Sequence, residues 1–266
     1  MERLIVIGII GFFAQFIDGT LGMGYGAFSA SFLIGTGVLP AIASASVHTA
    51  EIFTTLFSGG FHLWFGNVKK EWLLPLIVPG VVGGAAGAYF LSSIPGSTVK
   101  PFIAGLLLFL GIIVLYRFFP RRVVAPASKA DPPKQGVSSR VANSQAKLPA
   151  LGLVAAFVDA VGGGGWGPIA TPGLILTEDT EPSKVVGTVN LAEFFITIAI
   201  SATFIATLGL ETFEWDLVGA LLVGGVIAAP IAAYLCKKMP AKALGIFVGL
   251  ALVGFNLRTL IIALSG

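Results

Sequence analysis

Charged residues are scarce in this chain. Asp, Glu, Lys and Arg make up 11% of its 266 residues, whereas a soluble domain typically has about 25%, and its mean hydropathy is +0.94. This composition excludes a water-soluble globular domain. Because about 20 apolar residues span a bilayer as a helix, we expect an all-α polytopic membrane protein. The longest apolar runs are Ala41–Phe65, Pro101–Phe119, Trp215–Leu235 and Ala243–Leu257.

Residues that carry enzyme chemistry are also scarce. The single cysteine, Cys236, excludes an internal disulfide and a multi-cysteine metal site, and His48 and His62 are the only histidines. The motifs G-x-S-x-G and H-E-x-x-H do not occur. We therefore expect no enzyme, no metal and no cofactor. The basic pI of about 9.1 is attributed to cytoplasmic loops, which carry excess Lys and Arg in membrane proteins, and not to nucleic-acid binding.

An internal duplication organises the sequence. Residues 16–28, FIDGTLGMGYGAF, recur 141 positions later as FVDAVGGGGWGPI at 157–169. The segment VHTAEIFTT (47–55) likewise recurs as VNLAEFFIT (189–197), 142 positions later. We expect a first transmembrane repeat over 1–119 and a second over 149–266.

The connector and the lysines predict how the two repeats are oriented. Residues 120–148 are rich in Pro and Ser and carry six Lys or Arg against one Asp, which predicts a solvated cytoplasmic linker. In each half the broken segment is expected to return to its starting side as a re-entrant hairpin of two half-helices, Leu4–Ile17 and Ala27–Leu39 in the first half. Three transmembrane helices then follow. This arrangement makes the two repeats inverted, with both termini outside the cytoplasm and the acidic turn 211–216 outside as well. It also places a set of lysines inside: Lys69, Lys70, Lys237, Lys238 and Lys242.

Two acidic residues lie at matched depth within apolar segments. An ionisable residue at the centre of a transmembrane helix costs roughly 2.5–3.5 kcal/mol and therefore calls for a functional or structural reason. Glu51 and Glu193 are expected to handle protons, and polar neighbours on the same helix faces are expected to contact substrate. The alternative is that these groups hydrogen-bond across the repeat interface and hold the bundle together. The neighbours are His48, Thr55, Asn190 and Thr197.

The glycine-rich breaks predict an anion site built from backbone. Glycines allow close backbone approach, and a helix amino terminus inside a membrane presents unpaired N–H groups and a positive dipole end. Asp18 and Asp159, just before the breaks, are expected to cap exposed amides in preference to neutralising local charge. The residues expected to bind substrate here are Gly22, Gly24, Tyr25, Gly26, Gly163, Gly164, Gly165, Trp166 and Gly167.

These segments together resemble one family of transporters. GGGGWGPIATPGLIL (162–176) and VVGTVNLAE (185–193), with the weaker first-half versions LGMGYGAFSASFL (21–33) and ASASVHTAE (43–51), are similar to the TauE/SafE sulfite-exporter family. The resemblance covers nearly the whole chain apart from the linker. It implies two homologous halves and transport of sulfite, thiosulfate, sulfonates or related anions. The first half departs from the pattern: it lacks prolines equivalent to Pro168 and Pro172, so equivalence of the two half-sites is left open.

We therefore expect a secondary transporter, and more specifically an exporter, of a small sulfur-containing anion in the cell membrane, with proton coupling through the buried acids. A passive anion channel that uses the same backbone sites is the alternative. The expected partners are the anionic substrate and the lipid bilayer, and not nucleic acid. The sequence does not determine the oligomeric state, the specific anion or the coupling ion.

Overall fold

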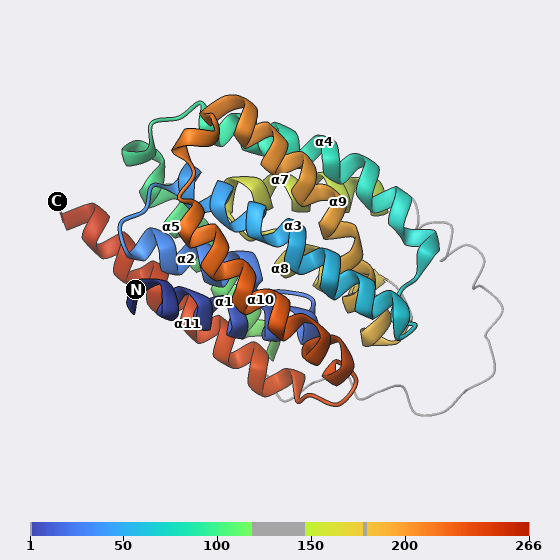
Figure 1. Ribbon diagram of the computed structural model, residues 1–266. Coiled ribbons are helices and arrows are strands. Elements are labelled where there is room, and N and C mark those ends of the chain that lie inside the picture. Colours follow the sequence, from blue (N-terminus) through green and yellow to red (C-terminus); the bar gives the residue numbers. More distant parts are fainter. Residues whose placement is uncertain (1, 119–146, 178–179, 266) are drawn as a thin grey trace, which may run out of the picture.

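The computed structural model describes residues 2–118, 147–177 and 180–265, and within them it is all-helical, without strands (Figure 1). This confirms the predicted fold class. The predicted linker lies outside the described residues, apart from Lys147 and Leu148. The first half comprises α1 (Glu2–Leu21), α2 (Tyr25–Gly35), α3 (Pro40–Trp64), α4 (Leu73–Ser92) and α5 (Gly96–Phe118). The second half comprises α7 (Leu148–Gly162), α8 (Trp166–Thr177), α9 (Pro182–Leu208), α10 (Trp215–Leu235) and α11 (Ala241–Ser265).

Most of these helices have the dimensions of membrane spans. Within the described residues, six segments are long and apolar enough to cross a bilayer: Glu2–Leu21, Lys70–Ser92, Gly96–Phe118, Pro182–Leu208, Trp215–Leu235 and Lys242–Ser265. Helix α3 is also long, with 25 residues, but it carries many polar side chains. The shorter helices next to the breaks, α2 and α8, have 11 and 12 residues, as expected for half-helices.

The first helix is longer than the sequence predicts. The predicted piece ends at Ile17, whereas α1 continues to Leu21 and has 20 residues. The backbone N–H of Gly22 donates to the carbonyl oxygen of Asp18 at 2.6 Å and closes the last turn, and the Thr20 hydroxyl donates to the carbonyl oxygens of Phe16 and Ile17. Gly22, with φ +69°, then ends the helix in the left-handed conformation that favours glycine. Asp18 therefore lies in the last turn of α1 and not in the break itself.

The helices of one half pack against helices of the other half in a symmetric pattern. α1 packs along α10 and α7 along α4, while α3 packs on α9 and α5 on α11. Because α7 and α4 are the repeat counterparts of α1 and α10, swapping the halves leaves this set of contacts unchanged. Individual contacts repeat too: a β-carbon on Gly19 would lie 2.6 Å from Cβ of Ala232, and one on Gly87 would lie 3.0 Å from Cβ of Ala160, the counterpart of Gly19.

Counterpart helices run antiparallel where they meet. Between α3 and α9, Ser58 contacts Asn190, whereas His48, ten residues earlier, lies beside Phe204. Between α5 and α11, Gly111 lies against Leu252 and Leu115 against Gly249. Helices of different halves that are not counterparts of each other, such as α1 and α10, run parallel where they pack. Antiparallel self-contacts are the packing expected of two halves with opposite orientation.

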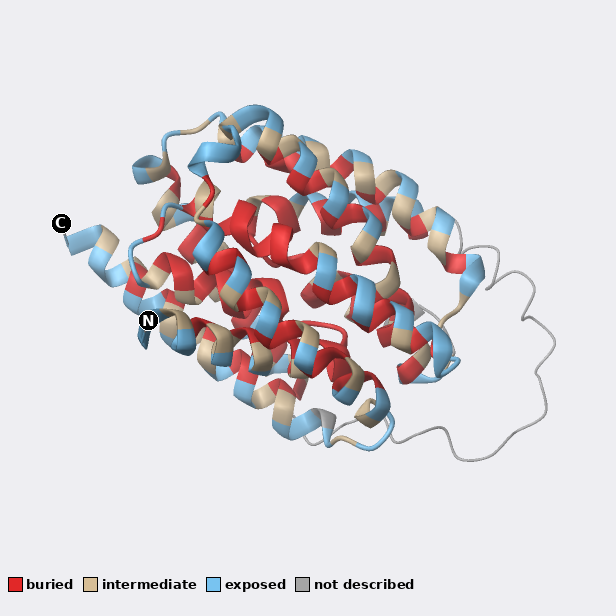
Figure 2. Ribbon diagram, viewed as in Figure 1, coloured by how far each residue is buried: buried red, intermediate tan, exposed pale blue. Residues whose placement is uncertain are grey.

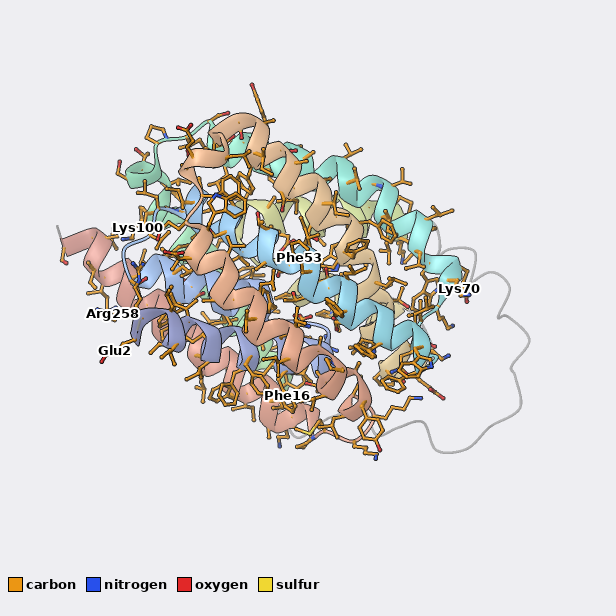
Figure 3. The ribbon with its side chains drawn as sticks, viewed as in Figure 1. Glu2, Phe16, Phe53, Lys70, Lys100 and Arg258 are labelled. Atoms are coloured by element: carbon orange, nitrogen blue, oxygen red, sulfur yellow. The ribbon has the colours of Figure 1, made fainter. Side chains whose placement is uncertain are left out.

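The two ends of the bundle differ in charge. Both chain termini lie at one end, together with Glu2, Lys100 and Arg258, whereas Lys70 lies at the other (Figures 1 and 3). Lys184 lies at the Lys70 end too, where it donates to the carbonyl oxygen of Gly66. The carboxyl terminus of α10 lies at the same end, since Tyr234 packs on Phe65. The loop that carries Glu211, Glu214 and Asp216 lies at the terminal end, where Arg3 pairs with Glu214 at 3.8 Å. The Lys70 end thus carries most of the described lysines, whereas the terminal end combines the acidic loop with Lys100 and Arg258.

Burial follows the pattern of a membrane protein. The outer faces of the long helices expose large apolar side chains, including Phe102, Phe109 and Ile227, while buried residues concentrate towards the middle of the bundle (Figure 2). Many polar side chains lie in this buried interior. The arrangement is inverted relative to a soluble protein, because lipid and not water is the solvent for the outer surface.

Candidate functional site

The two breaks meet at the centre of the molecule. A β-carbon on Gly26 would lie 2.7 Å from the carbonyl oxygen of Gly163, and one on Gly167 would lie 2.8 Å from the carbonyl oxygen of Gly22. The hydroxyl of Thr171 in α8 also donates to the Gly22 carbonyl oxygen. The break after α1 therefore crosses the break after α7 backbone to backbone, which only glycine permits at these positions.

The remaining break residues support this crossing. Gly22 and its counterpart Gly163 both have positive φ, +69° and +74°, and a β-carbon on Gly164 would overlap the backbone of Gly26 and Ala27. Gly165 packs against Val158 and Asp159, and Gly24 against Val248. The amino termini of α2 and α8 are thus brought to a common centre.

Asp159 holds the amino terminus of α8. Its Oδ1 accepts a hydrogen bond from the backbone N–H of Trp166 at 3.0 Å, and Trp166 is the first residue of α8. Its Oδ2 lies 3.1 Å from Nε2 of His48 on α3. The other ring nitrogen, Nδ1, lies 2.8 Å from the carbonyl oxygen of Ser44. One carboxyl group therefore connects the second break to the long helix of the first half.

Asp18 occupies the equivalent position in the first half. It interacts with the backbone N–H of Tyr25, the first residue of α2, and with the side chain of Asn190. Asn190 is the repeat counterpart of His48, so each acid before a break contacts the same position of the opposite half. The partner differs: it is a titratable imidazole in one half and a neutral amide in the other. Asn190 Oδ1 also accepts a 2.6 Å hydrogen bond from Ser58.

Glu51 and Glu193 lie beside this centre. Both are buried, with 1% and 4% of their surface exposed, and each is the twelfth residue of its helix, counted from Pro40 and Pro182. Glu51 Oε2 lies 3.8 Å from Nε2 of His48, yet neither oxygen of Glu51 has a hydrogen-bond partner. The two acids therefore occupy the same position along their helices.

Thr55 and Thr197 have hydroxyls that bond to their own helices. Thr55 donates to the carbonyl oxygen of Glu51, and Thr197 donates to that of Phe194 at 3.0 Å. Trp166 is similarly engaged, since its Nε1 donates to the carbonyl oxygen of Val189 at 3.1 Å. Tyr25, its counterpart, is buried with a hydroxyl that has no partner.

The structure adds polar residues that sequence reasoning missed. Ser44 donates to the carbonyl oxygen of Ala160 at 2.7 Å and thereby ties α3 to the end of α7. His62 Nε2 lies 2.9 Å from the carbonyl oxygen of Gly19. Thr54 is fully buried with an unpartnered hydroxyl. A comparison of the two halves could have identified all three residues, because each is polar where the other half has an apolar counterpart. The counterparts are Val186, Phe204 and Ile196.

The electrostatic balance of the centre is strongly acidic. Asp18, Glu51, Asp159 and Glu193 interact electrostatically with one another, and His48 is the basic group that contacts them. All five side chains are closed off from solvent. Several uncompensated carboxylates in a low-dielectric interior are costly, so such groups take up protons or pair with cations. No group of three His, Cys, Asp or Glu in the described part of the chain is arranged to hold a metal ion.

Comparisons with known proteins agree with this architecture. The family model described as "Sulfite exporter TauE/SafE" matches residues 7–259. The chain is also similar to a "Probable membrane transporter protein YtnM" of Bacillus subtilis (strain 168), with 46% identity over 261 residues that cover 98% of this chain and 84% of the relative. No solved structure matches it. The chain is thus a membrane transporter, and it belongs to the sulfite exporter TauE/SafE family.

Proposed function

We propose that the protein is a proton-coupled secondary transporter, and specifically an exporter, of a small sulfur-containing anion such as sulfite or an organosulfonate. The observation that carries the proposal is the crossing of the two breaks, which brings the amino termini of α2 and α8 to one buried centre. Helix amino termini carry partial positive charge and N–H donors, which suit an anion. Membership of the sulfite exporter TauE/SafE family supports a sulfur oxyanion as the substrate class.

Proton coupling follows from the acids around that centre. An anion that approaches ionised Glu51 or Glu193 is repelled, whereas a protonated carboxyl group is neutral and can donate a hydrogen bond. Anion binding and proton uptake therefore favour one another. By linkage, each event raises the affinity of the protein for the other.

Alternating access is the transport mode that the packing supports. Antiparallel contacts between α3 and α9 and between α5 and α11 favour inverted repeats, which in transporters surround a central site made by broken helices. The lysine-rich end is assigned to the cytoplasm of the cell. This assignment puts the chain termini outside, and the central site is closed to solvent in the conformation described here.

Flux measurements test the proposal. We expect purified protein in proteoliposomes to move sulfite with a pH-dependent rate, and we expect Glu51→Gln and Glu193→Gln to reduce that dependence. Asp216→Asn is the matched control, because Asp216 lies outside the centre at the start of α10. An unchanged pH dependence in both glutamine variants would contradict the proton role.

A passive anion channel uses the same backbone site and is the second candidate. The two are distinguished by counterflow: a carrier with alternating access accelerates labelled sulfite uptake when unlabelled sulfite is present on the opposite side, whereas a channel does not. We expect acceleration. Uptake that is unaffected by sulfite on the opposite side would favour the channel.

A further inference from the structure

Several buried hydroxyl and carboxyl groups on one side of the centre have no hydrogen-bond partner. They include Tyr25 Oη on α2, Thr54 Oγ1 and both oxygens of Glu51 on α3, and Asp18 Oδ2 on α1. Each of these residues is at most 2% exposed. A buried polar atom without a partner is destabilising, and native structures contain few of them. A cluster of such atoms therefore requires an explanation.

The unpartnered groups are neighbours. The hydroxyls of Tyr25 and Thr54 face each other beyond the 3.5 Å of an ordinary hydrogen bond, and Tyr25 interacts electrostatically with Glu51 and Asp18. Both Tyr25 and Thr54 lie against Gly225 of α10. A β-carbon there would be 3.3 Å from Cε2 of Tyr25 and would overlap the side chain of Thr54. Glu51 Oε1 lies 3.0 Å from where a β-carbon on Gly26 would be, next to the amino terminus of α2. The groups thus surround the start of α2.

Among the described residues of the opposite half, the two hydroxyls have no equivalent. The counterpart of Tyr25 is Trp166, whose Nε1 already donates to the Val189 carbonyl oxygen. The counterpart of Thr54 is Ile196, which has no polar atom and packs against Gly80. The two hydroxyls are therefore not a by-product of the duplication, since the second half has a bonded indole in place of Tyr25 and an apolar side chain in place of Thr54.

We propose that the oxyanion group of the substrate is bound asymmetrically, by the hydroxyls of Tyr25 and Thr54 together with the protonated carboxyl group of Glu51 at the amino terminus of α2. This inference rests on the transport function proposed above and assigns its substrate site to the first half. Hydroxyl and carboxyl O–H groups are donors, and a sulfur oxyanion with three oxygens can accept from all three. Thr54 takes the role that the sequence suggested for Thr55, whose hydroxyl is bonded to its own helix.

The second half then has a different task. Asp159 bonds the Trp166 N–H and anchors the second break to His48, which suits a rigid support more than a ligand site. Asp18 lies near Tyr25, and Asp159 and Glu193 lie near Glu51 and Asp18. These three acids are the charged groups that face the proposed site from α1, α7 and α9, so anion binding there requires that their charge be reduced or balanced.

The test uses Tyr25→Phe and Thr54→Val in the full-length protein, each of which removes one hydroxyl at nearly constant volume. The matched controls are Tyr89→Phe, at an exposed site on α4, and Thr49→Val on α3, whose hydroxyl donates to the Ala45 carbonyl oxygen. Uptake of labelled sulfite in proteoliposomes and the apparent Tm in detergent are measured for every variant. Sulfate, thiosulfate, methanesulfonate and acetate complete the substrate panel.

We expect Tyr25→Phe and Thr54→Val each to lower sulfite transport efficiency about tenfold or more, as for loss of a hydrogen bond to a charged ligand. Their Tm should equal or exceed that of the wild type, because an unpartnered buried hydroxyl is removed. The controls should transport sulfite within about twofold of the wild type.

Normal sulfite transport by both variants, with an active wild-type protein, would overturn the asymmetric site. A fall in Tm together with transport also overturns it, because the hydroxyls would then be structural. A wild-type protein that moves no anion of the panel overturns the proposed function itself.

Discussion

His48 and Asp159 are separated by 111 positions in the sequence, yet His48 Nε2 lies 3.1 Å from Asp159 Oδ2. The equivalent pair in the other half is Asn190 with Asp18. The same architectural contact is therefore made once by a group that can change its charge and once by a group that cannot. Since the two breaks are related by the duplication, this pair is a place where the two halves differ in titration chemistry.

Exchanging these partners should move the titrating group. His48→Asn keeps a hydrogen-bonding side chain beside Asp159 but removes the imidazole, so we expect the pH profile of transport to change in shape. Asn190→His introduces an imidazole beside Asp18 and serves as the reciprocal variant. The measurement is the initial rate of sulfite uptake between pH 5 and 8. Identical profiles for the wild type and both variants would argue against any role for the imidazole in proton handling.

Asp159 should contribute to stability through both of its oxygens. Loss of a helix cap costs about 0.5–2 kcal/mol, and removal of one partner of a buried ion pair costs about 3–5 kcal/mol. We therefore expect Asp159→Ala to lower the apparent Tm clearly. Asp159→Asn keeps a carbonyl oxygen for the Trp166 N–H and should lower it less. Equal effects of the two substitutions would mean that the cap contributes little.

Gly164 should tolerate no side chain. A β-carbon there would overlap the backbone of Gly26 and Ala27, and backbone atoms cannot move aside as a flexible side chain can. We expect Gly164→Ala to abolish folding, seen as loss of the monodisperse peak in size-exclusion chromatography. Gly60→Ala is the control, since a β-carbon at Gly60 on α3 meets nothing within 4 Å. A well-folded Gly164→Ala protein would show that the breaks do not cross as described.

The orientation in the membrane can be tested by labelling. Lys70 and Glu211 are both exposed, and they lie at opposite ends of the bundle. With cysteine placed at each position in a Cys236→Ser background, we expect a membrane-impermeant maleimide to label Glu211→Cys in intact cells. Lys70→Cys should react only after permeabilisation. Labelling of Lys70→Cys alone in intact cells would reverse the assignment of the two sides.

Cys236 should react slowly with maleimides. It follows the last residue of α10, and burial raises its pKa to about 12. Because the thiolate is the reactive species, this pKa leaves about a thousandfold less thiolate near neutral pH than an ordinary thiol with a pKa near 9. We expect slow maleimide labelling that accelerates as pH rises. Lys238→Cys in the Cys236→Ser background is the exposed comparison and should label rapidly. Equal rates at pH 7.5 would mean that Cys236 is accessible.

Much of the architecture could be predicted from sequence because it depends on composition and repetition. The apolar runs indicated membrane helices, and the recurrence of residues 16–28 at 157–169 indicated a duplication with two breaks. The glycines located the break, but the half-helix expected at Ala27–Leu39 spans Tyr25–Gly35 as α2. The extent of α1 was harder to predict, because Asp18, Gly19 and Thr20 favour a helix end locally, while the backbone hydrogen bond from Gly22 to Asp18 closes one more turn.

The candidate site was predictable only in part. Glu51 and Glu193 stand out in apolar segments, and their matched depth follows from their positions in the repeat. The distinction between Thr54 and Thr55 does not, because adjacent threonines are equivalent in composition and differ only in the direction their helix gives them. Thr55 faces its own backbone, whereas Thr54 faces Tyr25 and Gly225.

The sequence by itself therefore determined the membrane class, the two homologous halves and the position of each break, since these depend on hydrophobicity, local periodicity and glycine content. Only the tertiary structure decided that the breaks cross each other, that Asp159 reaches His48, and that unpartnered hydroxyls gather in the first half. Each of these facts is a contact between segments distant in the chain, and it arises from how the two halves pack, which no local pattern encodes.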